Sequence, residues 1–329
     1  MPATQTLPAV LMISTKLDPH VDAVLAILEK RAVPCFRLNT DHFHEEYRVA
    51  MADGVEGTIR IADRWGRSCV FPQGLRAVWM RKPEPSLPPP GIEDEGIVEY
   101  VRDEMREFMG FLPMDSRVPW INNPDENRRH QRKFPQLRLA QSLGLRVPRS
   151  IITNDPEAAE AFFATCPDGV ICKPMLMGSH YIDGAHHVAY TRRVPPGEFA
   201  ALKASIALCP TYLQEAIEKD HELRVTIIGD RLFNCRIDSQ GVAGAEQDWR
   251  AVDTIKLPHR IEPLRPDVDK ALRAYLKQCG LRFGAFDLIV TPEGEHVFLE
   301  LNPNGQWYWV ELATGAPMAE AMADLLEAS

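Results

Sequence analysis

Residues 286–302, which read FDLIVTPEGEHVFLELN, decide the fold. Two apolar runs flank the tripeptide Pro-Glu-Gly, a pattern that is typical of a β-hairpin. If the turn holds an even number of residues, Asp287 lies directly opposite Glu300. Asn302 then shares their face, because side chains alternate along a strand. A three-residue turn would instead separate these side chains across the sheet.

Two carboxylates that oppose each other between apolar strands repel, and their removal from water adds to the cost. A divalent cation would offset both effects. Oxygen ligands from Asp287, Glu300 and Asn302 suit Mg²⁺, which proteins often bind through a few carboxylates together with substrate phosphates. The alternative is a pair of solvated carboxylates on an exposed face, and the three residues alone leave both interpretations open.

The composition excludes several classes of protein. The chain has 329 residues, 25% of them charged, and a formal net charge of -9 without a basic run, so we expect no nucleic-acid partner. Its seven cysteines are scattered without the spacing of a zinc site. No apolar run reaches about 18 residues and no signal peptide precedes the first strand, so we expect a cytoplasmic protein without a membrane partner.

Elements expected on either side of the hairpin indicate three units. The N-terminal stretch predicts a strand at 9–13, a helix at 21–28 and a strand at 34–38, which is typical of a βαβ unit. An amphipathic helix is expected at 93–111, followed by a linker at 113–124.

The following helix is expected at 127–143 and a buried strand at 169–173. Gly229-Asp230 then indicates a tight turn between strands 223–228 and 232–237.

The hairpin and its continuation resemble a known family. The stretch 298–305, FLELNPNG, with Asp287 upstream, resembles the magnesium hairpin of ATP-grasp ligases. The continuation 306–311, QWYWVE, is narrower and resembles the microviridin-type graspetide synthetases, which form ester or amide crosslinks in ribosomal peptides. Trp79 and Arg81 fit that group as well.

The resemblance implies an α/β (α+β) architecture, the ATP-grasp fold. Three domains are expected: an N-terminal pre-ATP-grasp domain at 1–118, a central domain at 119–212 and a C-terminal antiparallel-sheet domain with the magnesium hairpin at 213–329.

The same resemblance assigns the cofactors, ATP and Mg²⁺. Mg²⁺ is expected on Asp287, Glu300 and Asn302. ATP is expected against Lys133, Lys173, Ser179, Gln214, Glu215, Ala216, Ile217 and Glu222. In this set the two lysines face the nucleotide, residues 214–217 meet the adenine, and Glu222 takes the ribose. The loop 175–184, which contains Ser179, is expected to close over the phosphates.

Arg224 and Arg236 are the candidate catalytic cations, because a transferring phosphoryl group and an acyl phosphate both need neighbouring positive charge. A two-residue turn between their strands would place them on opposite faces of the sheet, so that only one would serve. The implied reaction begins with attack of a substrate carboxylate on the γ-phosphate of ATP. A hydroxyl or an amine then captures the acyl phosphate, and the enzyme needs no nucleophile of its own.

The resemblance also implies the partner, a ribosomal precursor peptide with a leader and a core rich in acidic residues and threonine, and a homodimer. One alternative is a ligase that adds a free amino acid to a carboxylate, as the ribosomal-protein glutamate ligases do. An alternative of another class is a catalytically silent homologue that binds a nucleotide or a peptide. The aromatic continuation at 306–311 favours the peptide macrocyclase.

Overall fold

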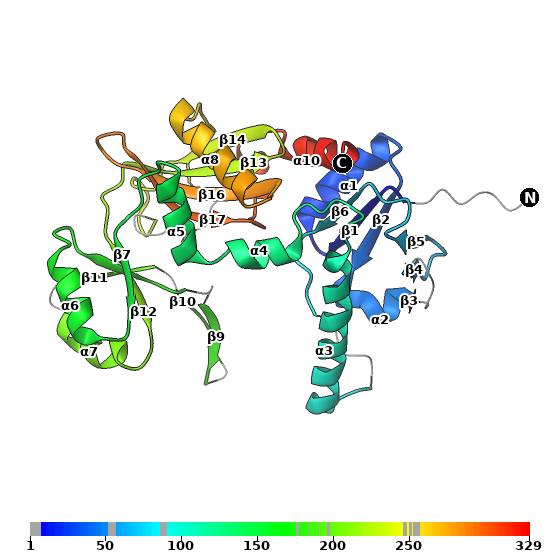
Figure 1. Ribbon diagram of the computed structural model, residues 1–329, viewed down its shortest axis with the longest axis horizontal. Coiled ribbons are helices and arrows are strands. Elements are labelled where there is room, and N and C mark those ends of the chain that lie inside the picture. The colour runs from blue at the N-terminus through cyan, green and yellow to red at the C-terminus, as the bar shows by residue number, and fades with distance from the viewer. Residues whose placement is uncertain are drawn as a thin grey trace, which may run out of the picture.

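In the computed structural model, the strands form separate sheets that lie in different parts of the molecule (Figure 1). The described residues are 8–51, 57–85, 91–175, 178–183, 185–189, 191–195, 198–245, 249, 252 and 257–329. Within these ranges the strands form five sheets. Figure 1 shows the C-terminal sheet above the central unit and beside the N-terminal unit.

The N-terminal unit begins with the expected βαβ arrangement. It contains β1 (Val10–Ser14), α1 (Pro19–Lys30), β2 (Cys35–Asn39), η1 (Thr40–His42), α2 (Phe43–Glu46), β3 (Tyr47–Met51), β4 (Ile59–Asp63), β5 (Ser68–Phe71), β6 (Ala77–Met80), α3 (Glu95–Phe111) and η2 (Leu112–Met114). The parallel sheet has the order β2-β1-β6, and β3-β4-β5 form an antiparallel sheet beside it. Every residue of β1 is buried, which explains its continuous apolar run.

Helix α3 projects from this unit. The side chain of Asp94 caps the helix by accepting a hydrogen bond from the backbone N–H of Ile97 at 3.0 Å. No residue of α3 is fully buried. Among the residues that the structure describes, no helix is long and apolar enough to cross a membrane.

The central unit is a small layer of strands and helices. It contains α4 (Pro124–His130), α5 (Lys133–Ser142), β7 (Ser150–Thr153), α6 (Pro156–Ala164), β8 (Val170–Lys173), β9 (Gly178–Ile182), β10 (Ala185–Ala189), β11 (Arg192–Val194), α7 (Phe199–Ile206) and β12 (Thr211–Glu215). The sheet has the order β11-β8-β12-β7, and β9 pairs with β10 as a separate hairpin.

Two expectations for this unit need correction. The single helix predicted at 127–143 is two helices, because the chain leaves helical geometry at Arg132 (ψ 112°) before α5 begins. The predicted boundary between residues 212 and 213 falls within β12. That whole strand pairs with β7 and β8 in the central sheet.

The C-terminal unit is an antiparallel sheet with helices. It contains β13 (His221–Ile228), β14 (Arg231–Ile237), β15 (His259–Ile261), α8 (Pro266–Gln278), β16 (Phe283–Val290), β17 (His296–Asn302), α9 (Tyr308–Thr314) and α10 (Met318–Glu327). The strand order is β15-β14-β13-β16-β17. One face packs on α5 and α8. There Tyr275 stacks on Phe298, and both rings meet Phe286 edge to face.

The end of the chain returns to its beginning. Helix α10 lies beside α1, which Figure 1 shows as the red and blue helices at the top right. Arg31 of α1 forms ion pairs with Asp324 at 2.8 Å and with Glu327 at 3.1 Å. Trp79 of β6 and the fully buried Trp307 belong to one core cluster, so the N-terminal and C-terminal units share a hydrophobic core.

Candidate active site

The hairpin of β16 and β17 differs from the expected one in its turn. Val290 pairs with His296, which leaves an odd, five-residue turn, so the condition of an even turn is not met. A β-bulge beside Asp287 then leaves Leu299 unpaired and shifts the register by one residue. Asp287 consequently pairs with Glu300, and their predicted position opposite each other is confirmed.

The two carboxylates lie in a charged network. Both oxygens of Asp287 accept hydrogen bonds from Nη1 of Arg224, at 2.8 and 2.9 Å. Glu300 forms an ion pair with Nζ of Lys133 at 3.0 Å. Between them, Nδ2 of Asn302 donates to Asp287 at 2.9 Å and to Glu300 at 3.5 Å. The three predicted metal ligands are therefore in contact, and basic side chains balance both acids.

This set of side chains fits a hard divalent cation. Within the described residues, no group of three or more His, Cys, Asp and Glu side chains is arranged so that it could hold a metal ion. The hairpin offers two carboxylates and one amide, and the atoms of these groups that can bind a metal are oxygens. Mg²⁺ needs few protein ligands of this kind when substrate phosphates and water complete its shell. The set therefore fits Mg²⁺ if a phosphorylated ligand binds beside it.

A cavity of about 460 Å³ opens beside the hairpin, between the central sheet and the C-terminal sheet. Nine of the predicted residues line it: Lys133, Lys173, Gln214, Glu215, Ala216, Ile217, Glu222, Asp287 and Glu300. Its volume is in the range of pockets that hold small ligands. Residues that are up to 167 positions apart in the sequence, such as Lys133 and Glu300, thus meet around one space.

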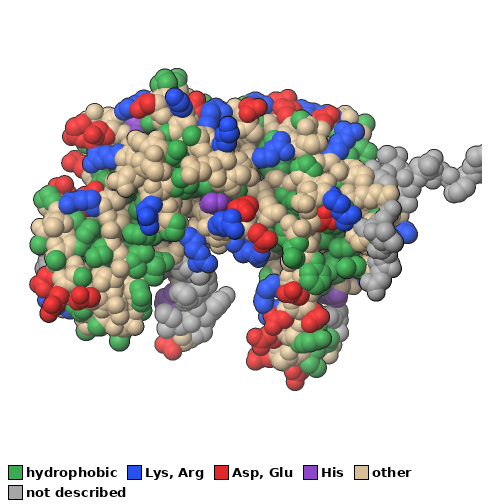
Figure 2. Space-filling model, viewed as in Figure 1, with side chains coloured by type: hydrophobic (Ala, Val, Ile, Leu, Met, Phe, Trp, Pro, Cys, Tyr) green, Lys and Arg blue, Asp and Glu red, His purple; other side chains and the backbone are tan. Residues whose placement is uncertain are grey.

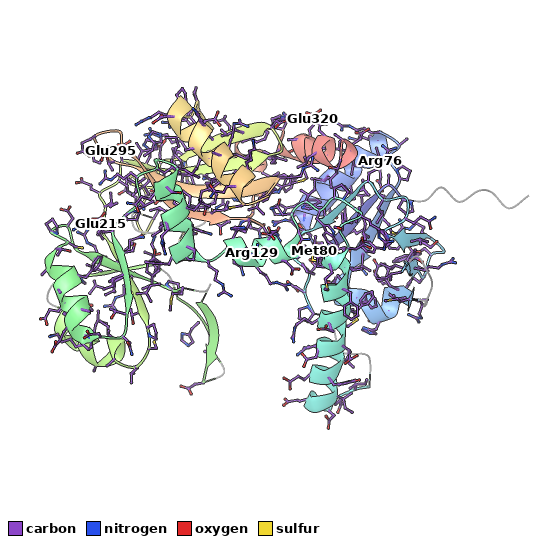
Figure 3. All side chains as sticks on the ribbon, in the orientation of Figure 1. Arg76, Met80, Arg129, Glu215, Glu295 and Glu320 are labelled. Atoms are coloured by element: carbon purple, nitrogen blue, oxygen red, sulfur yellow. The ribbon has the colours of Figure 1, made fainter. Side chains whose placement is uncertain are left out.

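The carboxyl end of β12 forms one wall of the cavity. Gln214 is 1% exposed, and its Nε2 donates to the hydroxyl groups of Tyr212 and Ser150, each at 3.0 Å. Glu215 accepts hydrogen bonds from the backbone N–H and Nε of Arg149, at 2.9 and 2.6 Å. Figure 3 shows Glu215 in the central unit and Glu295 at the turn of the hairpin above it. These contacts hold the wall in one position.

Some residues that line the cavity were not predicted. Lys219 forms an ion pair with Glu222, the residue expected to bind ribose, and both line the cavity. Asp168, Arg193 and Trp249 also line it. Lys219 could have been predicted from the charged run Glu218-Lys219-Asp220, which directly follows the predicted adenine segment. No sequence pattern indicates the other three.

The two candidate arginines lie on opposite faces of the sheet, as the two-residue turn predicts. Arg224 pairs in register with Cys235, whereas Arg236 pairs with Leu223. Arg236 donates from Nε to Asp238 at 2.6 Å and lies 3.3 Å from Asp220. The structure therefore brings Arg224 to the hairpin but does not bring Arg236 there.

Ser179 lies in β9, and its side chain is outside the described part of the chain. Its predicted contact with phosphate stays a prediction.

The segment after the hairpin packs tightly against Arg224. A Cβ atom added to Gly305 would lie 2.7 Å from Nη2 of Arg224 and 2.7 Å from Cβ of Ala285. Arg224 also donates from Nη2 to the carbonyl oxygen of Gln306 at 2.9 Å. Glycine is therefore required at position 305, because only a residue without a side chain lets the backbone approach the guanidinium this closely.

The N-terminal unit holds the same segment. Arg81, which follows β6 and is 1% exposed, donates to the carbonyl oxygen of Asn304 at 2.9 Å and to Oε1 of Gln306 at 3.1 Å. Burial lowers the pKa of Arg81 to about 10, so it stays charged at neutral pH. Nε2 of His20 accepts a hydrogen bond from the backbone N–H of Trp307 at 3.2 Å. Figure 3 shows Met80, directly before Arg81, beyond the end of the hairpin that is opposite Glu295.

Nε2 of His20 can accept that bond because the ring is held neutral. Burial lowers the pKa of His20, although a hydrogen bond to Asp18 acts in the opposite direction. Burial raises the pKa of Asp18, but hydrogen bonds from His20 and Ser14 outweigh it and hold that pKa well below its usual range. Ser14 donates to Asp18 at 2.5 Å.

Solved structures of ATP-grasp proteins share this architecture. No protein-family model matches the chain, and no curated protein sequence matches it. The macrocyclase MdnC from Microcystis aeruginosa MRC, bound with precursor peptide MdnA, is 27% identical over 97% of this chain and 99% of that chain, with a TM-score of 0.85. An ATP-grasp ligase associated with a ribosomal peptide from Chryseobacterium gregarium, in complex with ADP and a leader and core peptide, is 26% identical over 98% and 97%, with a TM-score of 0.88.

A structure with lower sequence identity shares the fold as well. The RimK domain ATP-grasp protein from Sphaerobacter thermophilus is 14% identical over 97% of this chain and 100% of that chain, with a TM-score of 0.55. The fold predicted from the hairpin motif is confirmed along nearly the whole chain. The chain is therefore an ATP-grasp ligase that resembles the microviridin-type graspetide synthetases.

Proposed function

We propose that the chain is an ATP-dependent peptide macrocyclase. It phosphorylates Asp or Glu side chains of a ribosomal precursor peptide and joins each acyl phosphate to a Thr or Ser hydroxyl or to a Lys amine of the same peptide. One observation carries the proposal: Asp287 and Glu300 of the metal hairpin also line the cavity that contains Lys133 and Lys173. The two acids would bind Mg²⁺ and the two lysines would bind phosphate, so the four side chains suit a metal-bound triphosphate.

The chain's own residues would position the reactants and neutralise charge. Lys133 and Lys173 supply positive charge to the phosphates, and the wall at 214–217 together with Glu222 holds the nucleoside. Arg224, fixed against Asp287, would supply positive charge beside the transferring phosphoryl group. Mg²⁺ on Asp287, Glu300 and Asn302 would supply Lewis-acid stabilisation of the transferring phosphoryl group.

The covalent chemistry needs no nucleophile from the enzyme. The substrate carboxylate forms a bond to the γ-phosphorus while the bond to the ADP oxygen breaks. A hydroxyl or amine of the peptide then attacks the acyl carbon and expels phosphate, and its proton passes to solvent. Each crosslink therefore removes one water from the peptide. Positioning and electrostatics account for the catalysis.

The surface around the site supports a peptide substrate. Figure 2 shows a hollow between the central unit and α3, with Lys and Arg side chains gathered at its top. Helix α4 supplies Arg129 there, as Figure 3 shows, and this side chain is largely exposed. Basic residues at the entrance suit a core rich in Asp and Glu. The M. aeruginosa and C. gregarium structures, which contain precursor, leader or core peptides, support the same substrate class.

Two other functions fit the site less well. A ligase that adds a free amino acid would use the same hairpin, but the RimK domain protein has a TM-score of 0.55 against 0.85 and 0.88 for the peptide ligases. A silent homologue would be expected to lose charged residues of the site. Here Lys133–Glu300 and Arg224–Asp287 are intact ion pairs, which favours an active enzyme. A cytoplasmic location and a homodimeric assembly complete the proposal and rest on the sequence resemblance.

Intact mass spectrometry tests the proposal. The purified chain is mixed with ATP, Mg²⁺ and the precursor peptide encoded by a short neighbouring reading frame. We expect losses of about 18 Da per ring that require ATP and are absent with the Glu300→Ala variant. A mass gain that matches one amino acid would identify the free amino-acid ligase. Tight nucleotide binding without ADP formation would identify the silent homologue.

A further inference from the structure

Trp249 brings an indole ring to the cavity, although the proposed function gives it no role. It lies in the connection between β14 and β15 of the C-terminal sheet, and its side chain is half-buried. Among the described residues that line the cavity, it is the only aromatic one. A large apolar ring beside the charged side chains of a reaction site therefore needs an explanation of its own.

Two further rings hold Trp249 in place. Trp309 of α9 lies against it, with ring centroids 5.1 Å apart and planes at 42°. His259 of β15 meets Trp309 edge to face, at 5.2 Å and 61°. Both tryptophans also pack against the hydrophobic core that the N-terminal and C-terminal units share. The ring that reaches the cavity is thus backed by close-packed structure, which fixes its position.

The same row of rings is connected to the metal hairpin. Trp309 follows Gln306 by three positions, which is nearly one helical turn. Arg224 donates to the carbonyl oxygen of Gln306 at 2.9 Å and to Oδ1 of Asp287 at 2.8 Å. Trp249 therefore belongs to the wall of the cavity that carries the hairpin, where the phosphoryl group would be transferred.

An acyl phosphate in this cavity can react in two ways. When a peptide hydroxyl attacks the acyl carbon, an ester bond forms, the bond to the phosphate oxygen breaks, and the hydroxyl proton passes to solvent. When water attacks the same carbon, the same bond breaks, but the products are the free carboxylate, phosphate and a proton. ATP is then consumed without a crosslink.

The charged lining of the cavity does not by itself prevent the second reaction. Side chains such as Lys133 and Glu300 are hydrated when no ligand covers them. An indole ring instead occupies space beside the reacting atoms and holds no water on its faces. Exclusion of water is a recognised way in which an active site protects a reactive intermediate.

We propose that Trp249, backed by Trp309 and His259, covers the acyl carbon on the side open to water and so directs the acyl phosphate to ring closure. This inference rests on the proposed function and adds to it a residue that couples ATP consumption to crosslinking. Trp249 makes and breaks no bond and moves no proton. It is a positioning residue that acts by occupying space.

A stacking surface for adenine is the other use of a tryptophan beside a nucleotide. The predicted adenine segment, residues 214–217, lies at the end of β12 in the central sheet. Trp249 comes from the C-terminal unit and is held by the segment that follows the metal hairpin. This arrangement favours the reacting end of the nucleotide. Stacking on adenine would change the KM for ATP, whereas exclusion of water changes the fate of the acyl phosphate.

The test counts ADP against crosslinks in water enriched in oxygen-18, with the precursor peptide that the wild-type enzyme dehydrates. Water that attacks the acyl carbon leaves a heavy oxygen in the peptide carboxylate, whereas ring closure leaves none. The variants are Trp249→Ala, Trp249→Phe and Trp65→Ala. Trp65 is a matched control, because it is 57% exposed in the turn between β4 and β5. The KM for ATP is measured for each protein.

We expect the wild type to form about one ADP per crosslink, and Trp249→Ala to form on the order of tenfold more, with heavy oxygen in the uncrosslinked Asp or Glu. Trp249→Phe should stay within about threefold of the wild type, because a phenyl ring fills most of the same space. Trp65→Ala should behave as the wild type.

Three results would contradict these expectations. A wild-type ratio of ADP to crosslinks in Trp249→Ala overturns the inference, whether or not its rate or its KM for ATP changes. Excess ADP without heavy oxygen in the peptide overturns it as well, because the acyl carbon is then not the atom that Trp249 protects. A wild-type enzyme that fails to dehydrate the peptide overturns the proposed function itself.

Discussion

The two faces of the C-terminal sheet carry opposite chemistry, although the same strands form both. On one face, Leu223, Val225, Phe286 and Phe298 are buried against α5 and α8. On the other face, Arg224, Asp287, Glu300 and Asn302 form hydrogen bonds and ion pairs beside the cavity. The alternation of side chains along each strand allows this division. The comparison teaches that a close-packed core on one face holds the reactive groups on the other at fixed distances.

The largest effect should follow from removing an acid on the cleft face. Glu300→Ala leaves Lys133 unpaired and removes a predicted metal ligand, so we expect the crosslinking rate to fall on the order of 10³-fold. The matched control is Glu295→Ala, an exposed acid in the turn of the same hairpin, which should stay within about twofold of the wild type. Equal losses in both variants would mean that the hairpin acts through its fold alone.

Substitution of Arg224 and Arg236, which lie on opposite faces of the C-terminal sheet, should show that only one face takes part in catalysis. Arg224→Lys replaces two hydrogen bonds to Asp287 by a point charge, and we expect kcat/KM for the peptide to fall about 10–100-fold. Arg236→Lys on the other face should change it by less than about threefold. Steady-state kinetics of both variants measures the difference. A larger loss from Arg236→Lys would restore that residue as the catalytic cation.

A smaller effect should follow from closing the space around Arg224. Gly305→Ala pushes a methyl group against the guanidinium and against Ala285, which should cost about 1–3 kcal/mol of transition-state stabilisation or of unfolding free energy. Gly110→Ala in α3 meets no atom within 4 Å and should stabilise the chain by about 0.5–1 kcal/mol. Denaturant titration and turnover rates, recorded for both variants, separate the two contributions. Wild-type values for Gly305→Ala would show that the backbone can move away.

The smallest effect concerns pH. The pKa of His20 is lowered in the folded protein, whereas in the unfolded chain it has its ordinary value of about 6.5. As the pH falls below that value, the unfolded chain takes up a proton more readily than the folded protein does. The free energy of unfolding should therefore fall from pH 7 to pH 5.5, by about 1 kcal/mol at most through this group. His20→Gln should flatten that slope. Asp18 would act only at much lower pH, because its own pKa is depressed.

A slope that is unchanged in His20→Gln would assign the pH dependence to other groups.

Much of the fold followed from local patterns. The apolar run at 9–13, the tight turn at Gly229-Asp230 and the helix at 93–111 each depend on neighbours in the sequence, and all three occur in the structure. The break between α4 and α5 was missed although Pro135 signals it. A proline has no N–H to donate to the carbonyl of residue 131, so it is tolerated in the first turn of α5 but not inside one continuous helix.

The site was predictable where a motif was continuous, as in β17, and where a lysine ended a strand, as in β8. The cavity residues Asp168, Arg193 and Trp249 were not predictable, since each comes from a segment without a motif and only the assembled units bring them together.

The bulge at Leu299 has a consequence for how the length of the hairpin can change. An odd turn alone would set Asp287 against Leu299, and the one extra residue restores Glu300 to that position. The register beyond the turn depends on the bulge and not on the length of the turn, because the pair Val290–His296 closes the turn whatever its length. A relative that lacks the residue at position 299 would keep its acids paired without a bulge. Aligning such hairpins from the turn outward would misplace the acid by one position, so they should be aligned from the acids inward.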